Sequence, residues 1–244
     1  MITETKVYTC RKCHSQEITK NGTNACGQPQ YHCKACGAYG VLEPKVRYTE
    51  AEKTIILNAY QERSSMRGIA RTFGVSRPTL SAWLKKSVER LPPLENTLAP
   101  VDREQTPVLE LDELWSFVYC KATKVWVWIA LSRETREVVA YACGDRSETT
   151  CQVLWERVPP SYRQATCYSD FWQAYQMVIP CEQHHAVGKE TGETAHIERW
   201  NNTLRQHLAR FVRKTLSFSK CFEMHEICLK LFLHRYNTEL LPSS

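Results

Sequence analysis

The sequence predicts an α/β domain over residues 108–244, preceded by a cysteine-rich module over 1–45 and a helical module over 46–90. Three observations predict this order. The first module is rich in Cys, Gly and polar residues, the second shows helical spacing of apolar residues, and the third begins with runs of β-branched and aromatic residues. Four prolines between residues 91 and 107, without helical or strand periodicity, predict an extended linker before the α/β domain.

Within the α/β domain, three strands come first, and their short connections are typical of consecutive antiparallel strands. The expected elements are strands at 108–118, 125–132 and 138–143, a helix at 148–158, a short strand at 166–169 and helices from about residue 195 onward. Strands first, then alternating helix and strand, predict a sheet covered by helices.

Composition restricts the class of protein. The chain has 244 residues, of which 43% are hydrophobic and 24% charged, and this balance excludes a disordered or fibrous protein. No apolar run approaches the roughly 18 residues of a membrane span, which excludes a membrane protein. The N-terminus lacks the basic-then-apolar pattern of a secretion signal, so we expect a cytoplasmic protein.

Charge is distributed unevenly along the chain. Residues 1–95 carry 15 Lys and Arg against 8 Asp and Glu, whereas residues 96–180 carry 8 against 11. A basic first part favours binding to a polyanion, and an acidic middle part favours chemistry that needs carboxylates. The charge pattern therefore separates a binding function from a carboxylate-dependent one.

Two C-x-x-C pairs in the first module have the spacing of a zinc ribbon. The four cysteines are Cys10, Cys13, Cys33 and Cys36. Each pair aims two thiolates at one point, and soft sulfur suits tetrahedral Zn²⁺. We expect a structural Zn²⁺ because a segment this poor in apolar residues has no other means to offset its chain entropy. Cys26 has no partner at this spacing and is expected to be a loop residue.

A helix–turn–helix pattern runs from Ser65 to Lys86. Apolar residues fall on one face of each of two expected helices, and Gly74 between them permits the positive φ of a tight turn. Ser76 is placed to cap the second helix, with Pro78 in its first turn. The alternative interpretation is a helical hairpin that only packs against the rest of the chain.

The second of these helices is predicted to enter the major groove of DNA. Its outward side carries Arg77, Thr79 and Ser81, which would lie near base edges. Lys85 and Lys86 follow and would contact phosphates. The basic charge of this part of the chain favours DNA binding over packing alone.

Three carboxylates are predicted to meet at one edge of the sheet. Asp112 is placed near the end of the first strand and Asp170 directly follows a later one, and carboxylates at the ends of adjacent strands converge where ligands bind. Glu198 borders an apolar stripe on an expected helix, and Asn202 and Arg205 share its face. Three carboxylates are what two Mg²⁺ ions need across a scissile phosphate, and Arg205 could hold that phosphate.

Other acids compete for these places. Glu110 and Glu113 flank Asp112 on the same strand, and Asp145 precedes an expected helix. Asp145 fits better as the turn and helix-start residue before Ser147. An acid taken alone is more often a cap, a turn residue or a solvated charge. The common context of strand, strand and helix favours the three acids named above.

These residues together resemble the insertion-sequence-one family of bacterial transposases, almost from end to end of the chain. The matching blocks are the four knuckle cysteines, the helix–turn–helix, LDELWSFV at 111–118, GDRSETTC at 144–151, YSDFWQAY at 168–175 and HIERWNNTLRQHLARFVRKTLSFSK at 196–220. The last block is the most specific of them.

The resemblance implies a ribonuclease-H-like catalytic domain with an Asp-Asp-Glu triad at Asp112, Asp170 and Glu198. It also implies Mg²⁺-dependent cutting and joining of double-stranded DNA at inverted terminal repeats, followed by joining to target DNA. Such an enzyme acts as an oligomer that holds two DNA ends, and we expect it on the nucleoid. The alternative is a non-catalytic DNA-binding repressor whose C-terminal domain serves only for oligomerisation.

Overall fold

In a computed structural model of the chain, residues 2, 6–43, 48–101 and 104–240 are described. The chain divides into two compact units, residues 1–53 and 54–244, and each is described by itself. The boundary expected between residues 45 and 46 lies outside the described residues. In these ranges, no helix combines the length and apolarity that a bilayer span needs.

The first unit is built around a three-stranded antiparallel sheet. Its strands, in spatial order, are β1 (Ile18–Thr23), β2 (Pro29–Cys33) and β3 (Tyr39–Val41). Its core cluster consists of Cys10, Tyr31 and Cys33. A core this small does not offset the entropy of ordering the unit, so stability must come from another source.

Three helices follow along the chain. They are α1 (Glu50–Gln61), α2 (Met66–Phe73) and α3 (Arg77–Glu89). The turn between α2 and α3 contains Gly74 at a φ of 67°, and its N–H donates to the carbonyl of Ala70. Ser76 then caps α3 by accepting a hydrogen bond from Thr79 N at 3.2 Å. Gly74 and Ser76 therefore occupy the turn and cap positions that the sequence assigns to them.

A five-stranded mixed sheet forms the centre of the second unit, in the order β6-β5-β4-β7-β8. The strands are β4 (Val108–Phe117), β5 (Lys124–Ser132), β6 (Val138–Gly144), β7 (Thr166–Ser169) and β8 (His184–Ala186). β4, β5 and β6 are antiparallel, whereas β7 and β8 run parallel to β4. The sequence predicted the first four strands but not β8, because three residues are too few to show a strand period.

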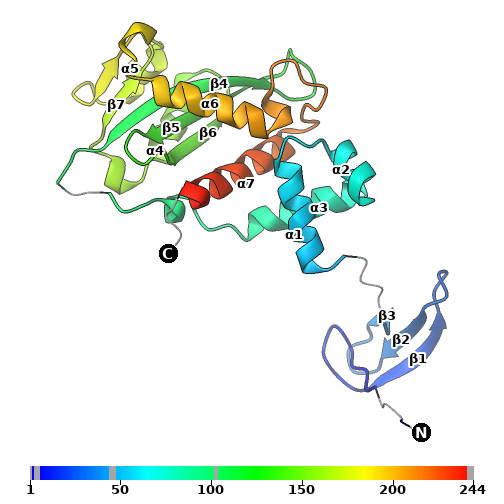
Figure 1. Ribbon diagram of the computed structural model, residues 1–244. Helices are drawn as coiled ribbons and strands as arrows, with labels where there is room; N and C mark the ends of the chain where they lie inside the picture. The colour runs from blue at the N-terminus through cyan, green and yellow to red at the C-terminus, as the bar shows by residue number, and fades with distance from the viewer. Residues whose placement is uncertain (1, 3–5, 44–47, 102–103, 241–244) are drawn as a thin grey trace. The chain divides into compact units, whose positions relative to one another are not determined.

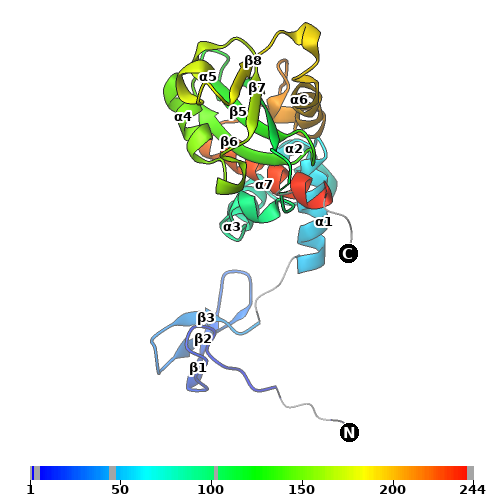
Figure 2. The same ribbon diagram turned by 90° about the vertical axis from the view of Figure 1, so that its left-hand side faces the viewer.

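Helices cover both faces of this sheet. α4 (Glu148–Glu156) and α5 (Gln173–Val178) pack on one face, and α6 (Ala195–His207) and α7 (Phe222–Leu240) pack on the other. Figure 1 shows α6 and α7 crossing the same side of the strands, and Figure 2 shows α4 and α5 on the other side. Four short 3₁₀ helices connect these elements in the described ranges: η1 (Leu94–Thr97), η2 (Pro160–Tyr162), η3 (Lys189–Thr191) and η4 (Ala209–Phe211).

β4 serves both helical layers because successive side chains of a strand point to opposite faces. Leu109 and Leu111 belong to the core under α4 and α5, whereas Leu114 belongs to the core under α6 and α7. Glu110 and Asp112 alternate with the first pair and therefore face α6. This alternation decides which acids of the strand can meet residues of α6.

The segment 91–107 differs from the expected extended linker. Within the second unit, its 3₁₀ helix η1 packs against the sheet domain. Leu94 contacts the core under α6 and α7, and Thr97 is buried. Thr97 Oγ1 accepts a hydrogen bond from the Nδ2 of Asn237, 140 positions later. A local composition rule does not detect such a partner, because the contact is made only in the folded chain.

Asn237 also closes the edge of the sheet at β6. Its Oδ1 accepts a hydrogen bond from Val138 N at 2.9 Å, and its Nδ2 donates to Val138 O at 3.0 Å. The side-chain amide therefore pairs with the edge strand as a neighbouring backbone would.

We predict that Asn237→Ala lowers the free energy of unfolding by roughly 2 to 4 kcal/mol, because two buried backbone groups lose their partner. Urea denaturation followed by circular dichroism measures the change. Thr238→Ala, one residue later and exposed, is the control and should change stability by less than about 0.5 kcal/mol. Equal losses in the two variants would contradict the edge-pairing role.

Candidate functional site

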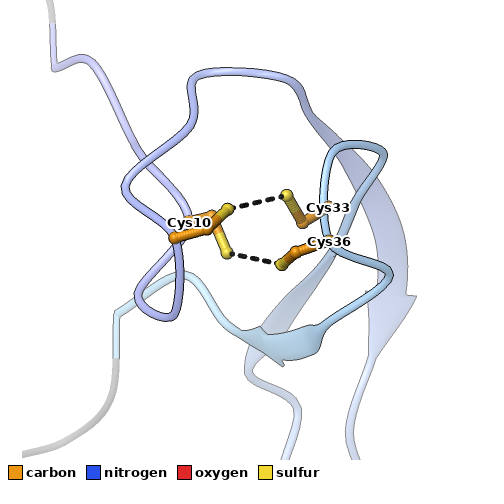
Figure 3. Close-up of side chains that lie close together, drawn as sticks. Cys10, Cys33 and Cys36 are labelled. Carbon is orange, nitrogen blue, oxygen red and sulfur yellow. Dashed lines mark hydrogen bonds between the residues drawn. The ribbon is translucent and has the colours of Figure 1, made fainter.

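The four predicted zinc-ligand cysteines form a cluster in the first unit. Their Sγ atoms all lie within 4.8 Å of one another. Cys10 and Cys36 Sγ are 3.6 Å apart, as are Cys13 and Cys33 Sγ, and Figure 3 shows the two turns facing each other across these atoms. Four converging thiols could hold a Zn²⁺. Cys26 is exposed and stands outside the cluster.

Two matching turns bring the cysteine pairs together. His14 N donates to Cys10 O at 2.8 Å in the first turn, and Gly37 N donates to Cys33 O at 2.9 Å in the second. His14 and Gly37 both adopt positive φ angles, 59° and 69°. The backbone N–H of Cys13 lowers the pKa of the Cys10 thiol to about 6, which favours the thiolate that a metal needs.

We predict that Cys33→Ser releases the metal and unfolds residues 6–43, because binding and folding are coupled in a unit with so small a core. The unit 54–244 should keep its fold. Metal analysis and amide hydrogen exchange measure the two effects, and Cys26→Ser is the matched control, expected to retain the zinc. A full zinc equivalent in Cys33→Ser would contradict the assignment.

Asp112 lies on β4, and Asp170 directly follows the adjacent parallel strand β7. β4 pairs with β7 so that Glu110 lies opposite Tyr168, and the two aspartates come two residues further along. Asp112 lies within β4, not near its end as the sequence suggested, because β4 continues past β7 in its pairing with β5. Asp170 therefore lies just beyond the end of β7, on the side of β4 that β7 pairs with.

Glu198 in α6 lies close enough to act on Asp112 electrostatically. Burial raises the pKa of the Asp112 carboxyl to about 7, and the charges of Glu113, Asp170 and Glu198 add to the rise. Several carboxylates thus repel one another here, a condition that a bound cation relieves. Among the described residues, the four cysteines are the one group of three or more possible metal ligands whose ligand atoms all lie within 4.8 Å of one another. The carboxylate oxygens of the three acids are farther apart than this.

Asn201 in α6 holds Asp112 in place, and the sequence did not identify it. Its Nδ2 donates to Asp112 Oδ2 at 2.6 Å, while the backbone N–H of Glu113 donates to Oδ1 at 2.8 Å. Asn201 is buried, whereas Asn202, which the sequence placed beside Glu198, is exposed. Asn201 could have been identified from the sequence, because it is a polar residue within the apolar stripe of α6 and such a residue needs a hydrogen-bond partner when buried.

Arg205 lies further along α6 and is half-buried. Burial and the charge of Arg213 lower the pKa of its guanidinium, and the charge of Asp112 opposes this shift. In the described part of the chain, its buried Nε has no hydrogen-bond partner. A cation beside the acids with an unused donor is suited to bind a phosphate.

Glu113 faces the opposite side of the sheet from Asp112. It accepts hydrogen bonds from Tyr175 OH at 2.8 Å and from Arg146 Nε at 2.5 Å. Arg146 stacks on the ring of Trp172, with 3.9 Å between its guanidinium carbon and the ring centroid, and it lies 3.8 Å from Asp170 Oδ2. Glu113 is therefore neutralised by Arg146, which also approaches the candidate site.

The two remaining competitors have structural partners. Glu110 is fully buried and pairs with Arg133 at 2.9 Å. Asp145 Oδ1 accepts hydrogen bonds from Ser147 Oγ at 2.5 Å and Thr150 Oγ1 at 2.7 Å at the start of α4. The prediction that Asp145 is a turn and helix-start residue is confirmed.

The residues predicted for DNA contact have different surroundings on α3. Arg77 and Lys86 are exposed. The hydroxyl of Thr79 lies 2.7 Å from that of Ser76. Helical spacing places Thr79 and Lys86 on the side of α3 away from Ser81 and Lys85, whereas Arg77 lies one turn before Ser81 on the same side.

Ser81 and Lys85 lie on the face of α3 that packs against α7. Ser81 Oγ is 3.5 Å from Met224 Sδ, and Lys85 Nζ pairs with Glu223 at 2.8 Å. Both residues are engaged within the second unit, which the helical spacing alone did not indicate.

Comparisons with known proteins match the second unit. Residues 107–238 match the family model described as IS1 transposase. The InsB protein of insertion element iso-IS1n from Shigella dysenteriae is 38% identical over 129 residues, which are 53% of this chain and 95% of that protein. The InsB protein of IS1 4 from Escherichia coli K12 is 35% identical over 125 residues, 51% of this chain and 72% of that protein. The matched range contains all three acids and Arg205.

Proposed function

Since the chain belongs to the IS1 transposase family, we propose that it binds inverted terminal repeats and catalyses metal-dependent DNA cleavage and strand transfer. The observation that carries the proposal is the buried Asp112 on β4, whose pKa is raised by burial and by the charges of Asp170, just after the neighbouring strand β7, and of Glu198 on α6. Holding two DNA ends and a target requires more than one copy of the chain, so the proposed active form is an oligomer on DNA.

The proposed fold class of the second unit is ribonuclease-H-like. Three antiparallel strands followed by two parallel ones, with helices on both faces, support this class. The order of the acids along the chain, strand first, strand end second and helix third, supports it further. Fold alone does not carry the activity, so the proposal rests on the site.

We assign Asp112, Asp170 and Glu198 as the ligands of two Mg²⁺ ions. The oxygen-only donor set fits Mg²⁺, which keeps several waters and needs few protein ligands. The three carboxylates are too far apart to coordinate one ion together. They could instead be shared between two ions roughly 3.5 to 4 Å apart. When bound, the ions supply activation of the attacking oxygen and stabilisation of the leaving oxygen.

The residues around the acids orient them. Asn201 Nδ2 and Glu113 N each hold one oxygen of Asp112, and Trp172 N donates to Asp170 Oδ1 at 3.0 Å. Arg205, a half-buried cation on α6, is assigned to the DNA phosphate. These contacts position the carboxylates before DNA arrives, which reduces the reorganisation needed for reaction.

DNA binding is assigned to the first 90 residues, with the zinc-bound cysteine unit as a structural element. On α3, the exposed Arg77, together with Thr79, would read bases, and Lys86 would contact a phosphate. Ser81 and Lys85 join this set only if DNA displaces their contacts with α7.

We predict that Asp112→Asn, Asp170→Asn and Glu198→Gln each abolish nicking and strand transfer, because each removes an anionic metal ligand while keeping its shape. The substrate is a duplex carrying the repeat from the DNA that flanks the reading frame, incubated with Mg²⁺ or Mn²⁺ and resolved on a denaturing gel. Chelation should stop the wild-type reaction.

The control for these variants is Asp145→Asn, since asparagine keeps an Oδ1 that can accept from Ser147 and Thr150 at the start of α4 and should leave cleavage intact. Normal cleavage by Asp170→Asn, or loss only in Asp145→Asn, would overturn the assignment. A wild-type protein that binds the duplex but never nicks it with metal would favour the repressor alternative.

DNA reading by α3 has its own test. Arg77→Ala should weaken binding to the terminal repeat by roughly 1 to 3 kcal/mol and leave random duplex less affected, because a base contact is lost. Lys86→Ala should weaken binding to all duplexes alike and reduce the salt dependence by about one phosphate contact. Fluorescence anisotropy over a salt series measures both. Equal losses on both duplexes for Arg77→Ala would exclude base reading by that residue.

A further inference from the structure

Two loops of the second unit lie side by side near the candidate site. One, residues 118–124, runs from the end of β4 to Lys124, the first residue of β5, and the other, residues 212–221, joins η4 to α7. Tyr119 N donates to Ser219 O at 2.8 Å, and Val118 forms a parallel bridge with Ser219. Figure 1 shows the green and orange loops adjacent at one end of the sheet. We call them the paired loops.

All of the charged residues in the paired loops are basic. Their sequences contain five Lys and Arg residues and no Asp or Glu. The five are Lys121, Lys124, Arg213, Lys214 and Lys220, and all are exposed. Exposed cations from two segments on one surface attract a polyanion and favour nucleic acid over a neutral partner.

Two large apolar side chains project from the same loops. Leu216 is 99% exposed and Tyr119 is 69% exposed. Tyr119 also has a φ of 70°, in the left-handed region that non-glycine residues rarely adopt. Single exposed apolar residues are common on proteins, but these two stand among five cations on loops bonded to each other. DNA-bending proteins use this combination: cations on phosphates and an apolar side chain between base steps.

A buried network anchors the base of the loops. Ser219 Oγ accepts a hydrogen bond from Arg210 Nη1 at 3.0 Å and lies 2.8 Å from His225 Nδ1. The other ring nitrogen of His225 lies 2.8 Å from Ser116 Oγ on β4. Phe218 packs on Phe117, with ring centroids 5.5 Å apart. The base is therefore held on the sheet while Leu216 stays in solvent, as a wedge requires.

The loop 212–221 begins five residues after α6, the helix that carries Arg205, with η4 between them. The charge of Arg213 acts on Arg205, which in turn lies within electrostatic range of Asp112. β4 connects the two places directly, since the strand carries Asp112 and ends where the first of the paired loops begins. DNA whose phosphate reaches Arg205 would therefore extend along the paired loops.

We propose that the paired loops grip duplex DNA beside the bond to be cut, with their five cations on phosphates and Leu216 and Tyr119 inserted against unstacked bases. The proposal rests on the proposed function, because it places this surface beside the cleavage site. It assigns a DNA-distorting role to residues outside the acids and outside α3.

The test compares two substrates: the fully paired terminal-repeat duplex, and the same duplex with about two mismatched base pairs beside the cleavage site. Leu216→Ala should cleave the paired duplex about tenfold more slowly than the wild type, because the wedge no longer offsets unstacking. The mismatched duplex, already unstacked, should restore the rate to within about twofold. Tyr119→Asn, which tolerates positive φ, should show the same pattern.

Controls separate this role from general effects. Leu216→Met keeps an apolar side chain and should lose less of the paired-duplex rate than Leu216→Ala does. Met177→Ala removes an exposed apolar residue of α5 and should cleave both substrates as the wild type does. Lys214→Gln should weaken binding to both substrates equally. The proposal would be overturned if Leu216→Ala cleaved the paired duplex at the wild-type rate. It would also be overturned if this variant lost the same fraction of its cleavage rate on both substrates.

A second measurement does not depend on cleavage. In Asp170→Asn, which binds DNA without cutting it, 2-aminopurine beside the cleavage site should fluoresce more strongly on binding, and adding Leu216→Ala should remove the increase. If the wild type cuts neither substrate in the presence of metal, the proposed chemistry fails, but the fluorescence still shows whether Leu216 unstacks the bases. If fluorescence does not change in Asp170→Asn, the wedge fails while the chemistry stands.

Discussion

The buried carboxylate of Glu110 fixes helix α6 to strand β4, and the arrangement of the candidate site depends on this contact. Its Oε2 accepts hydrogen bonds from two backbone N–H groups in the first turn of α6, both at 3.0 Å. The N-cap residue of α6 makes no side-chain cap bond, so these donors would otherwise be unpaired. Arg133 pairs with the other oxygen and offsets the cost of burying the charge. Because Asp112 follows Glu110 by two residues on the same face, and Glu198 lies in that first turn, one interaction sets the separation of two proposed ligands.

Alternation along β4 explains why neighbouring acids have different roles. Asp112 faces α6, where it meets Asn201 and the charge of Glu198, whereas Glu113 faces α5 and is neutralised by Arg146. A shift of one residue in the pairing of β4 would exchange these faces and bring Glu113 to α6. The nine paired positions between β4 and β5 and the parallel pairing with β7 hold the register. The same pairing that builds the sheet therefore selects the acid that can meet Glu198.

Local patterns were sufficient to predict the strands β4 to β7, the cysteine cluster and the cap at Asp145, because each depends on residues near in sequence or on a fixed spacing. Contacts between distant segments were not predictable in this way. The packing of η1 depends on Asn237, and the engagement of Lys85 depends on Glu223, 138 positions later. Asn201 was missed for a related reason: a polar residue in an apolar stripe is interpretable only once its partner on β4 is known. The proposed ligands were named from their common context of strand, strand and helix, whereas the residues that hydrogen-bond to them look like ordinary polar residues in the sequence.

The first turn of α7 connects the three parts of the second unit that the proposals involve. Glu223 and Met224 contact α3, the carbonyl of Met224 accepts a hydrogen bond from Arg210, and His225 bonds both β4 and the loop 212–221. Three consecutive residues thus support the proposed DNA-reading helix, the strand of Asp112 and the paired loops. A duplex that displaced Lys85 from Glu223 would act on the same helical turn that anchors the basic loop. The proposed DNA-reading helix and the paired loops therefore share one packed support, the first turn of α7.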